Sequence, residues 1–97
     1  MKELVIPRIT ATAGLKGEMD ENILIRIEVT KAIGRFLKND WGIIDKEDHR
    51  QNDIDLKERD GRLLAKYQTA AGDIYITRDF GDTEKEDIIT TMFCEEY

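Results

Sequence analysis

The stretch RLLAKYQTAAGDIYIT, residues 62–77, decides the expected fold because it has the pattern of two strands joined by a tight turn. Ile74 and Ile76 stand two residues apart, as they do on one face of a half-buried strand. The turn falls on AAGD at 70–73, which combines small residues with a glycine and aspartate pair. We therefore predict an antiparallel hairpin over residues 61–77.

Further strands are expected on both sides of this hairpin in the sequence. An acidic segment, 79–87, precedes IITTMF at 88–93, whose β-branched side chains predict a third strand. Near the N-terminus, ELVIPRI at 3–9 is also rich in β-branched residues, but Pro7 has no backbone N–H to donate in a central strand. The expected sheet is a three-stranded antiparallel meander, with room for an N-terminal strand at its edge.

The segment DENILIRIEVTKAIGRFLKN, residues 20–39, fits two structures in its first half. Its apolar residues recur every three to four positions from Ile25 to Leu37, as on one face of a helix. In residues 22–30, however, apolar and polar residues also alternate, as they do in a strand. The longer helical pattern, with Asp20 as its cap, favours one helix over about 21–38 that covers the apolar face of the hairpin.

A second helix is predicted over residues 45–58. Asp45 can cap its N-terminus, and acidic residues in the first turn suit the positive end of the helix dipole. Ile54 and Leu56 are its only clear apolar residues, so most of this helix should lie in water. The sequence therefore predicts an α+β fold in a single domain, residues 1–97, with two helices followed by the meander.

The charge of the chain narrows the kinds of partner that it can bind. Its 97 residues include 15 lysines and arginines against 21 aspartates and glutamates, which gives a formal net charge of -6. Such a charge disfavours binding to nucleic-acid phosphates and to anionic membranes. We expect no direct nucleic-acid binding and no membrane association, and a basic surface of another protein suits the chain better.

The sequence offers little chemistry for catalysis, a metal or a cofactor. Cys94 and His49 are the only cysteine and the only histidine, so neither a disulfide nor a cysteine and histidine zinc site can form within the chain. The glycines form no phosphate-binding loop, and no segment reads as a signal peptide or a membrane span. We predict a cytoplasmic protein with no catalytic residues, no metal site and no cofactor.

Two groups of residues are candidates for binding. The first group is acidic and lies on the predicted second helix, where few side chains are needed for packing: Glu47, Asp48, Asp53 and Asp55. The second group could line a pocket for a small molecule: Trp41, Asn52, Arg62 and Tyr67. Because apolar Ile43 and Ile44 follow soon after Trp41, we expect the tryptophan ring to plug the core beneath its turn.

A series of short motifs runs through the second half of the chain. They are NDWG at 39–42, EDHRQND at 47–53, GRLLAKY at 61–67, IYIT at 74–77 and a threonine pair before the terminal EEY. In order and spacing they resemble the small "plasmid-related" hypothetical proteins of bacteria. The chain departs from that family at Asn39, Tyr75 and Cys94, where the family has glycine, tryptophan and proline. The resemblance implies a setting on plasmids, phages or integrated elements, and it implies no catalytic residues.

Together these observations predict a small acidic, non-enzymatic binding protein of a mobile genetic element. An inhibitor of host defence, directed against a restriction or CRISPR nuclease, is the most concrete form of this hypothesis, because an acidic patch can contact a basic protein surface. The alternative is a regulatory domain that binds a small molecule or an ion in a pocket near Trp41 and Tyr67.

Overall fold

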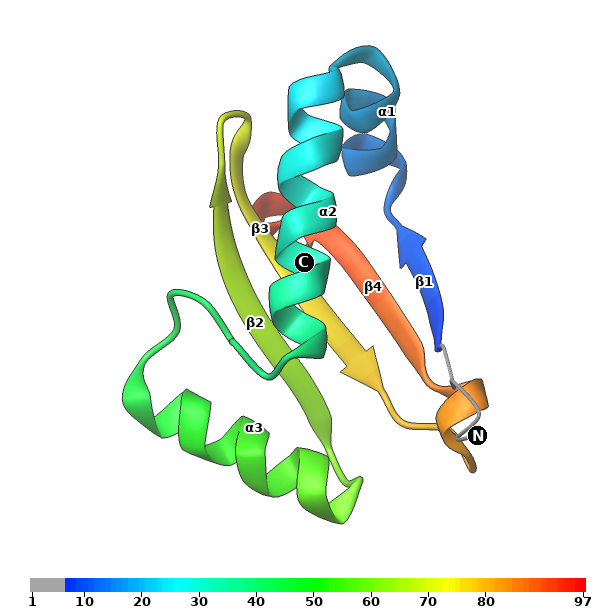
Figure 1. Ribbon diagram of the computed structural model, residues 1–97, viewed down its shortest axis with the longest axis vertical. Coiled ribbons are helices and arrows are strands. Elements are labelled where there is room, and N and C mark those ends of the chain that lie inside the picture. The colour runs from blue at the N-terminus through cyan, green and yellow to red at the C-terminus, as the bar shows by residue number, and fades with distance from the viewer. Residues whose placement is uncertain (1–6) are drawn as a thin grey trace.

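The computed structural model describes residues 7–97 and shows an α+β fold (Figure 1). Along this part of the chain the elements are β1 (Arg8–Ala11), α1 (Ala13–Glu21), α2 (Ile23–Leu37), α3 (Lys46–Glu58), β2 (Arg62–Thr69), β3 (Gly72–Asp79), η1 (Glu84–Glu86), β4 (Ile88–Phe93) and η2 (Cys94–Glu96). None of the helices described is long and apolar enough to cross a membrane. The predicted fold class is confirmed, but the number of helices and the make-up of the sheet differ from the prediction.

The four strands form one mixed sheet in the order β1-β4-β3-β2. β2 pairs with β3, and β3 with β4, in antiparallel fashion, which confirms the predicted hairpin and third strand. β1 extends the sheet beyond β4 and runs parallel to it, so the sheet has four strands and is mixed, whereas the prediction counted three antiparallel strands and gave no direction for the edge strand. The edge strand predicted over 3–9 begins only after Pro7, and residues 3–6 lie outside the described part of the chain.

One face of the sheet packs against α2, with α1 beside it, and holds the hydrophobic core (Figure 1). The strand register places the buried side chains of Leu63, Ala65, Tyr67, Ile74, Ile76 and Ile89 on this face. α2 contributes four buried residues at helical spacing, namely Ile25, Val29, Ala32 and Phe36. The predicted packing of this helix on the apolar face of the hairpin is therefore confirmed.

Residues 22–30, whose sequence fits either a helix or a strand, form the N-cap and the first half of the helix α2. The cap is Asn22 and not the predicted Asp20, because the Asn22 side chain accepts a hydrogen bond from the Leu24 N–H at 3.1 Å. Asp20 belongs to the preceding helix, α1. The chain turns at Asn22, so the periodic segment starts two residues later than expected.

The sequence offers Thr12 as the cap of a short helical turn over residues 13–19, which the structure extends to the full helix α1, but this turn was not counted among the two predicted helices. Gly14 and Gly17 lower its intrinsic stability by roughly 1 kcal/mol each relative to alanine, which makes it a weak signal in the local sequence. Contacts with distant residues offset this loss. Leu15 is fully buried, and the Glu96 carboxylate accepts hydrogen bonds from the Thr12 hydroxyl at 2.8 Å and from the Gly14 N–H at 3.3 Å. A residue near the C-terminus thus caps a helix near the N-terminus.

Candidate binding surface on the acidic helix

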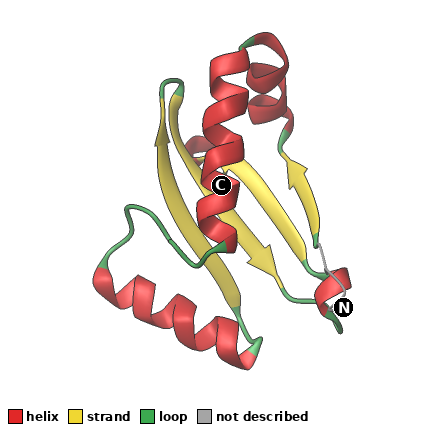
Figure 2. Cartoon of the chain, in the orientation of Figure 1, coloured by secondary structure: helices red, strands yellow, loops and turns green. Residues whose placement is uncertain are grey.

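α3 stands apart from α1 and α2, beside the outer edge of β2 (Figure 2). Its N-terminus is capped as predicted, because the Asp45 side chain accepts a hydrogen bond from the Asp48 N–H at 2.9 Å. The helix ends at Glu58, and Arg59 caps it in a left-handed conformation with a φ of 53°. Between these ends Asn52 is the one fully buried residue, so α3 contacts the sheet through a narrow side.

Asn52 joins α3 to the free edge of β2. Its Nδ2 donates a hydrogen bond to the Leu64 carbonyl at 2.8 Å, and its Oδ1 accepts one from the Leu64 N–H at 3.3 Å. The amide thus satisfies both backbone groups that an edge strand leaves open at this residue. Because Asn52 is only 5% exposed, these bonds are shielded from water and fix the position of the helix along the strand.

Trp41 provides the second anchor of α3. Its ring is 1% exposed, as predicted for a core plug, and its centroid lies 5.3 Å from that of Phe36 in an edge-to-face contact. The indole Nε1 donates to Asp53 Oδ1 on α3 at 2.9 Å. Gly42 follows with a φ of 77°, and a Cβ there would collide with the Lys66 carbonyl. This glycine lets the Trp41 loop lie directly against β2.

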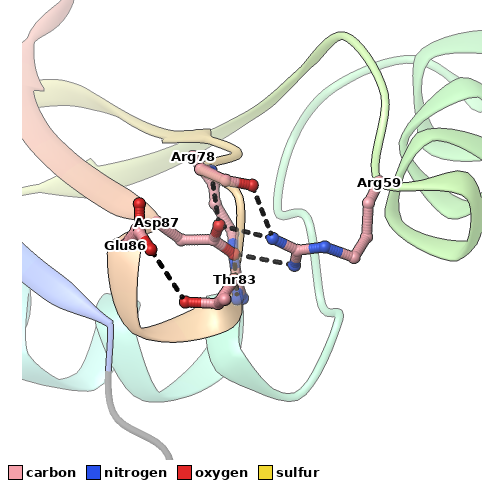
Figure 3. Close-up of polar contacts among 6 residues, drawn as sticks. Arg59, Arg78, Thr83, Glu86 and Asp87 are labelled. Carbon is pink, nitrogen blue, oxygen red and sulfur yellow. Dashed lines mark hydrogen bonds and ion pairs between the residues drawn. The ribbon is translucent and has the colours of Figure 1, made fainter.

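A buried charge cluster forms the third anchor, at the C-terminal end of α3 (Figure 3). Asp87 is fully buried and accepts hydrogen bonds on both carboxylate oxygens. Arg59 donates through Nη1 and Nη2 at 2.9 and 2.7 Å, and Arg78 donates through Nε and Nη2 at 2.9 and 2.7 Å. The Gly81 N–H donates a further bond at 2.7 Å. The cluster therefore ties the end of α3 to β3 and to the loop before β4.

This environment keeps Asp87 ionised. Burial by itself raises the pKa of the carboxyl group, but hydrogen bonds from Arg59, from the Gly81 N–H and from Arg78 outweigh burial and lower the pKa from 3.8 to about 2. The Arg59 and Arg78 guanidinium groups also lie 5.0 and 5.9 Å from the centroid of the Phe80 ring. Since each charged group contacts another member of the cluster, we assign the cluster a structural role.

The charges of α3 separate into two stripes on the helix surface. At about 100° per residue, four acidic residues fall within roughly 100° of one another and three basic residues within roughly 40°. The acidic stripe consists of Glu47, Asp48, Asp55 and Glu58, and the basic stripe of Lys46, Arg50 and Lys57. All of them are exposed except Asp55, which is half-buried. The signs alternate along the sequence, but the folded helix presents one acidic flank to solvent.

Three of the four acidic residues predicted to bind a partner, Glu47, Asp48 and Asp55, lie in this acidic stripe. Asp53 lies on another side of the helix, where its carboxylate accepts the hydrogen bond from Trp41. Glu58 was outside the predicted set and completes the stripe in the last turn. In the folded helix, Glu58 therefore takes the place of Asp53 in the exposed acidic surface.

The four residues predicted to line a pocket occupy structural positions. Trp41 and Asn52 are buried and bonded as described, and Tyr67 is 1% exposed and donates its hydroxyl hydrogen to the Asp40 carbonyl at 2.6 Å. Burial raises the pKa of Tyr67. Arg62 lies on the opposite face of the sheet, five positions along β2 from Tyr67, and pairs with Asp79 at 2.7 Å. The structure thus brings Arg62 to a different place from the other three.

His49 and Cys94 also have structural surroundings. His49 Nε2 lies 3.3 Å from the Gly42 carbonyl oxygen. The Cys94 thiol is half-buried, and burial raises its pKa, which keeps it in the less reactive neutral form. Within residues 7–97 no group of three histidine, cysteine, aspartate or glutamate side chains could hold a metal ion.

Sequence reasoning did not identify the Asp87 cluster. Asp87 is 28 residues from Arg59 and 9 residues from Arg78, and no local pattern links residues at these separations. One signal was present, because Asp87 directly precedes the apolar strand β4, where a charged side chain needs a partner if it is buried. That signal marks Asp87 but does not select its arginines.

Comparisons with known proteins find no family model, no curated protein and no solved structure that matches this chain. The fold and the surface of α3 are therefore the features that bear on the function of this chain.

Proposed function

We propose that this chain is a small acidic, non-enzymatic binding protein, and that the acidic stripe of α3 contacts a basic region of another protein. The observation that carries the proposal is that this helix exposes its acidic residues while three contacts with buried groups fix its position. Asn52, Trp41 and Asp87 hold α3 from the core side, through bonds to buried groups. Glu47 and Glu58 of the acidic stripe lie roughly 120 to 140° around the helix from Asn52 and Asp53, and both are exposed.

A rigid helix with separated charges suits recognition of a protein. Ordered groups lose less conformational freedom on binding than groups on a mobile segment, so more of the contact energy appears as affinity. At a rise of about 1.5 Å per residue, Glu47 and Asp48 lie about 10 to 17 Å along the helix axis from Asp55 and Glu58, so the acidic stripe offers two contact points for arginine or lysine side chains of a partner. Complementary charges also accelerate the encounter of the two proteins.

The neighbouring surface of α3 gives the contact a defined orientation. Ile54 is 42% exposed and lies between the acidic stripe and the basic stripe. A partner therefore meets negative, apolar and positive groups in that order across the helix. A reversed partner would bring like charges together, which disfavours the wrong orientation.

The partner that fits this proposal best is a host nuclease in the bacterial cytoplasm. The resemblance to plasmid-related proteins supports a mobile element as the source of the chain. Nucleases of restriction and CRISPR systems bind DNA phosphates, for which they need exposed lysines and arginines. The acidic stripe would occupy part of such a basic surface, and the chain would inhibit the nuclease without touching DNA.

Transformation of bacteria with a plasmid that the nuclease recognises tests this proposal. Host cells that express the chain are compared with cells that lack it, in one strain with an active restriction system and in one with an active CRISPR system. We expect the chain to raise the number of transformants by about tenfold or more in one strain. A tenfold change corresponds to about 1.4 kcal/mol of binding free energy between the chain and the nuclease.

Two variants with the same change in net charge make the test specific for α3. Glu47→Lys with Glu58→Lys reverses two exposed members of the acidic stripe at opposite helix ends, so their effects on the helix dipole offset each other. Asp82→Lys with Glu95→Lys reverses two exposed acids outside α3 and serves as the control. Protection should be lost in the first variant and kept in the control. Equal protection by both variants, or none by the wild type in either strain, would contradict the proposal.

A further inference from the structure

α2 carries a second apolar stripe on the side turned away from the sheet. The outer stripe consists of Ile23, Ile27, Thr30, Gly34 and Leu37. Ile23 is 70% exposed, Ile27 is 46% exposed and Leu37 is 47% exposed. Isoleucine and leucine are usually buried, so three of them in one row on a helix surface mark a contact face more than a solvated one.

The spacing of the outer stripe is that of a helix pairing seam. Its members follow at intervals of four, three, four and three residues, which is the a and d repeat of a coiled coil. The inward residues Ile25, Val29, Ala32 and Phe36 follow the same kind of spacing and fill the core. α2 is therefore apolar on two opposite sides, and within residues 7–97 the sheet covers one of them.

The middle of the outer stripe is small. Gly34 has no heavy atom within 4 Å of the position that a Cβ would take, so nothing in the described chain requires glycine there, although glycine weakens a helix. Thr30 donates its hydroxyl hydrogen to the Arg26 carbonyl at 2.8 Å, which satisfies the hydroxyl within the helix. The two residues leave a notch where another helix can approach closely. Beside it lies an apolar groove of about 410 Å³ lined by Ile23, Arg26, Ile27, Thr30 and Lys31.

The charges at the two ends of α2 favour pairing with a second copy of the chain whose α2 runs in the opposite direction. Exposed Asp20 and Glu21 lie just before the first residue of α2 and exposed Lys38 follows its last residue, while Lys31 lies next to Thr30 in the middle of the helix. In an antiparallel pair each acidic end faces a basic end. A parallel pair would place like charges opposite each other, and a helix of the same chain is the one partner sure to carry this arrangement.

We propose that two copies of the chain associate through their outer stripes, with the α2 helices antiparallel and Thr30 near the two-fold axis. Ile27 of each copy then enters the notch at Gly34 of the other, and Ile23 packs against Leu37 of the other. The same patch is used on both subunits, as a two-fold interface requires. The acidic stripe of α3 lies on a separate helix and stays available in both copies.

Sedimentation equilibrium tests this association. Over concentrations from about 5 to about 500 µM, where weak dimers form, we expect the mass to rise from 11.2 kDa towards twice that value. Ile27→Glu and, separately, Gly34→Leu should each lower the association constant by about tenfold or more. Gly34→Leu should fold, because its side chain meets no atom of the described chain within 4 Å of Cβ.

Ile54→Glu is the matched control, since Ile54 is 42% exposed on α3 and lies outside the outer stripe. It should associate like the wild type, and circular dichroism should show that all variants are folded. A wild-type mass that stays at 11.2 kDa over the whole range would overturn the proposal and leave the outer stripe to a different protein. Variants that are folded and associate as well as the wild type would also overturn it.

Cross-linking with a short bismaleimide tests the direction of the pair in a Cys94→Ser background. Thr30→Cys should cross-link to itself, and Ile23→Cys should cross-link to Leu37→Cys when the two proteins are mixed. Ile23→Cys alone should remain uncoupled, because the two copies of residue 23 lie at opposite ends of the pair. Efficient coupling of Ile23→Cys to itself, with none to Leu37→Cys, would overturn the antiparallel arrangement.

Discussion

Replacing Asp87 by asparagine removes the only negative charge between Arg59 and Arg78 in the buried cluster. Asparagine keeps the shape of the side chain, but one carboxylate oxygen becomes an NH2 group that faces other donors. Breaking a buried ion pair by removing one partner costs about 3 to 5 kcal/mol, because the remaining charge is buried without compensation. We expect Asp87→Asn to lower the free energy of unfolding at pH 7 by this amount.

The pKa of Asp87 gives a second, independent estimate of the contribution. A carboxyl group whose pKa falls from 3.8 to about 2 on folding stabilises the folded state by about 2 kcal/mol above the unfolded pKa, at 1.36 kcal/mol per pH unit. This stabilisation is present at neutral pH and is lost as the pH falls from about 4 to about 2. On acidification the wild type should lose this stabilisation, whereas Asp87→Asn has none to lose. The difference between their free energies of unfolding should therefore narrow by about 2 kcal/mol.

Urea unfolding followed by tryptophan fluorescence measures both effects, because Trp41 is 1% exposed and becomes solvated on unfolding. Asp79→Asn is the control: it breaks the ion pair with Arg62, whose side chains are 48% and 44% exposed, and should cost under about 1 kcal/mol. If Asp87→Asn costs no more than Asp79→Asn, or if the difference from wild type is the same at low and neutral pH, the cluster does not anchor α3 as described.

Two further changes test the core. Trp41→Ala should lower the free energy of unfolding by about 3 to 5 kcal/mol, measured by circular dichroism, because it empties the core beneath the turn and leaves Asp53 without its donor. An effect below about 1 kcal/mol would show that the ring is not a core plug. Thr77→Val should raise the thermal midpoint, with a gain of about 1 kcal/mol, because the buried Thr77 hydroxyl has no hydrogen-bond partner among the described residues. A lower midpoint would mean that the hydroxyl has a partner after all.

The sequence was sufficient to predict the elements whose stability depends mainly on residues close together in the chain. The hairpin is formed by alternating apolar residues around Gly72, and α2 is formed by a helical period long enough to outweigh the strand-like start at 22–30. The Asp45 cap and the burial of Trp41 were also predictable, since each depends on neighbouring residues. These features place α3 beside the sheet but do not show how it is fixed there.

The remaining features depend on residues that are far apart in the sequence. β1 pairs with β4 across about 80 positions, and the hydrogen bond from Thr12 to Glu96 spans 84. The Asp87 cluster likewise joins three separate segments. The predicted acidic group is divided for a different reason. Asn52 and Trp41 set the rotation of α3, and this rotation turns the carboxylate of Asp53 towards the Trp41 indole and away from the acidic stripe. Charge counts along the sequence contain no information on that rotation.

Quantitative affinity capture is the most direct test of the claim that the acidic stripe of α3 binds a protein. Three proteins are immobilised and exposed at equal salt to lysate from the strain in which the chain protects the plasmid: the wild type, Glu47→Lys with Glu58→Lys, and Asp82→Lys with Glu95→Lys. We expect one nuclease subunit to be retained by the wild type and by the control, and to be retained about tenfold less by the α3 variant. Equal retention of that subunit by all three proteins would contradict the claim.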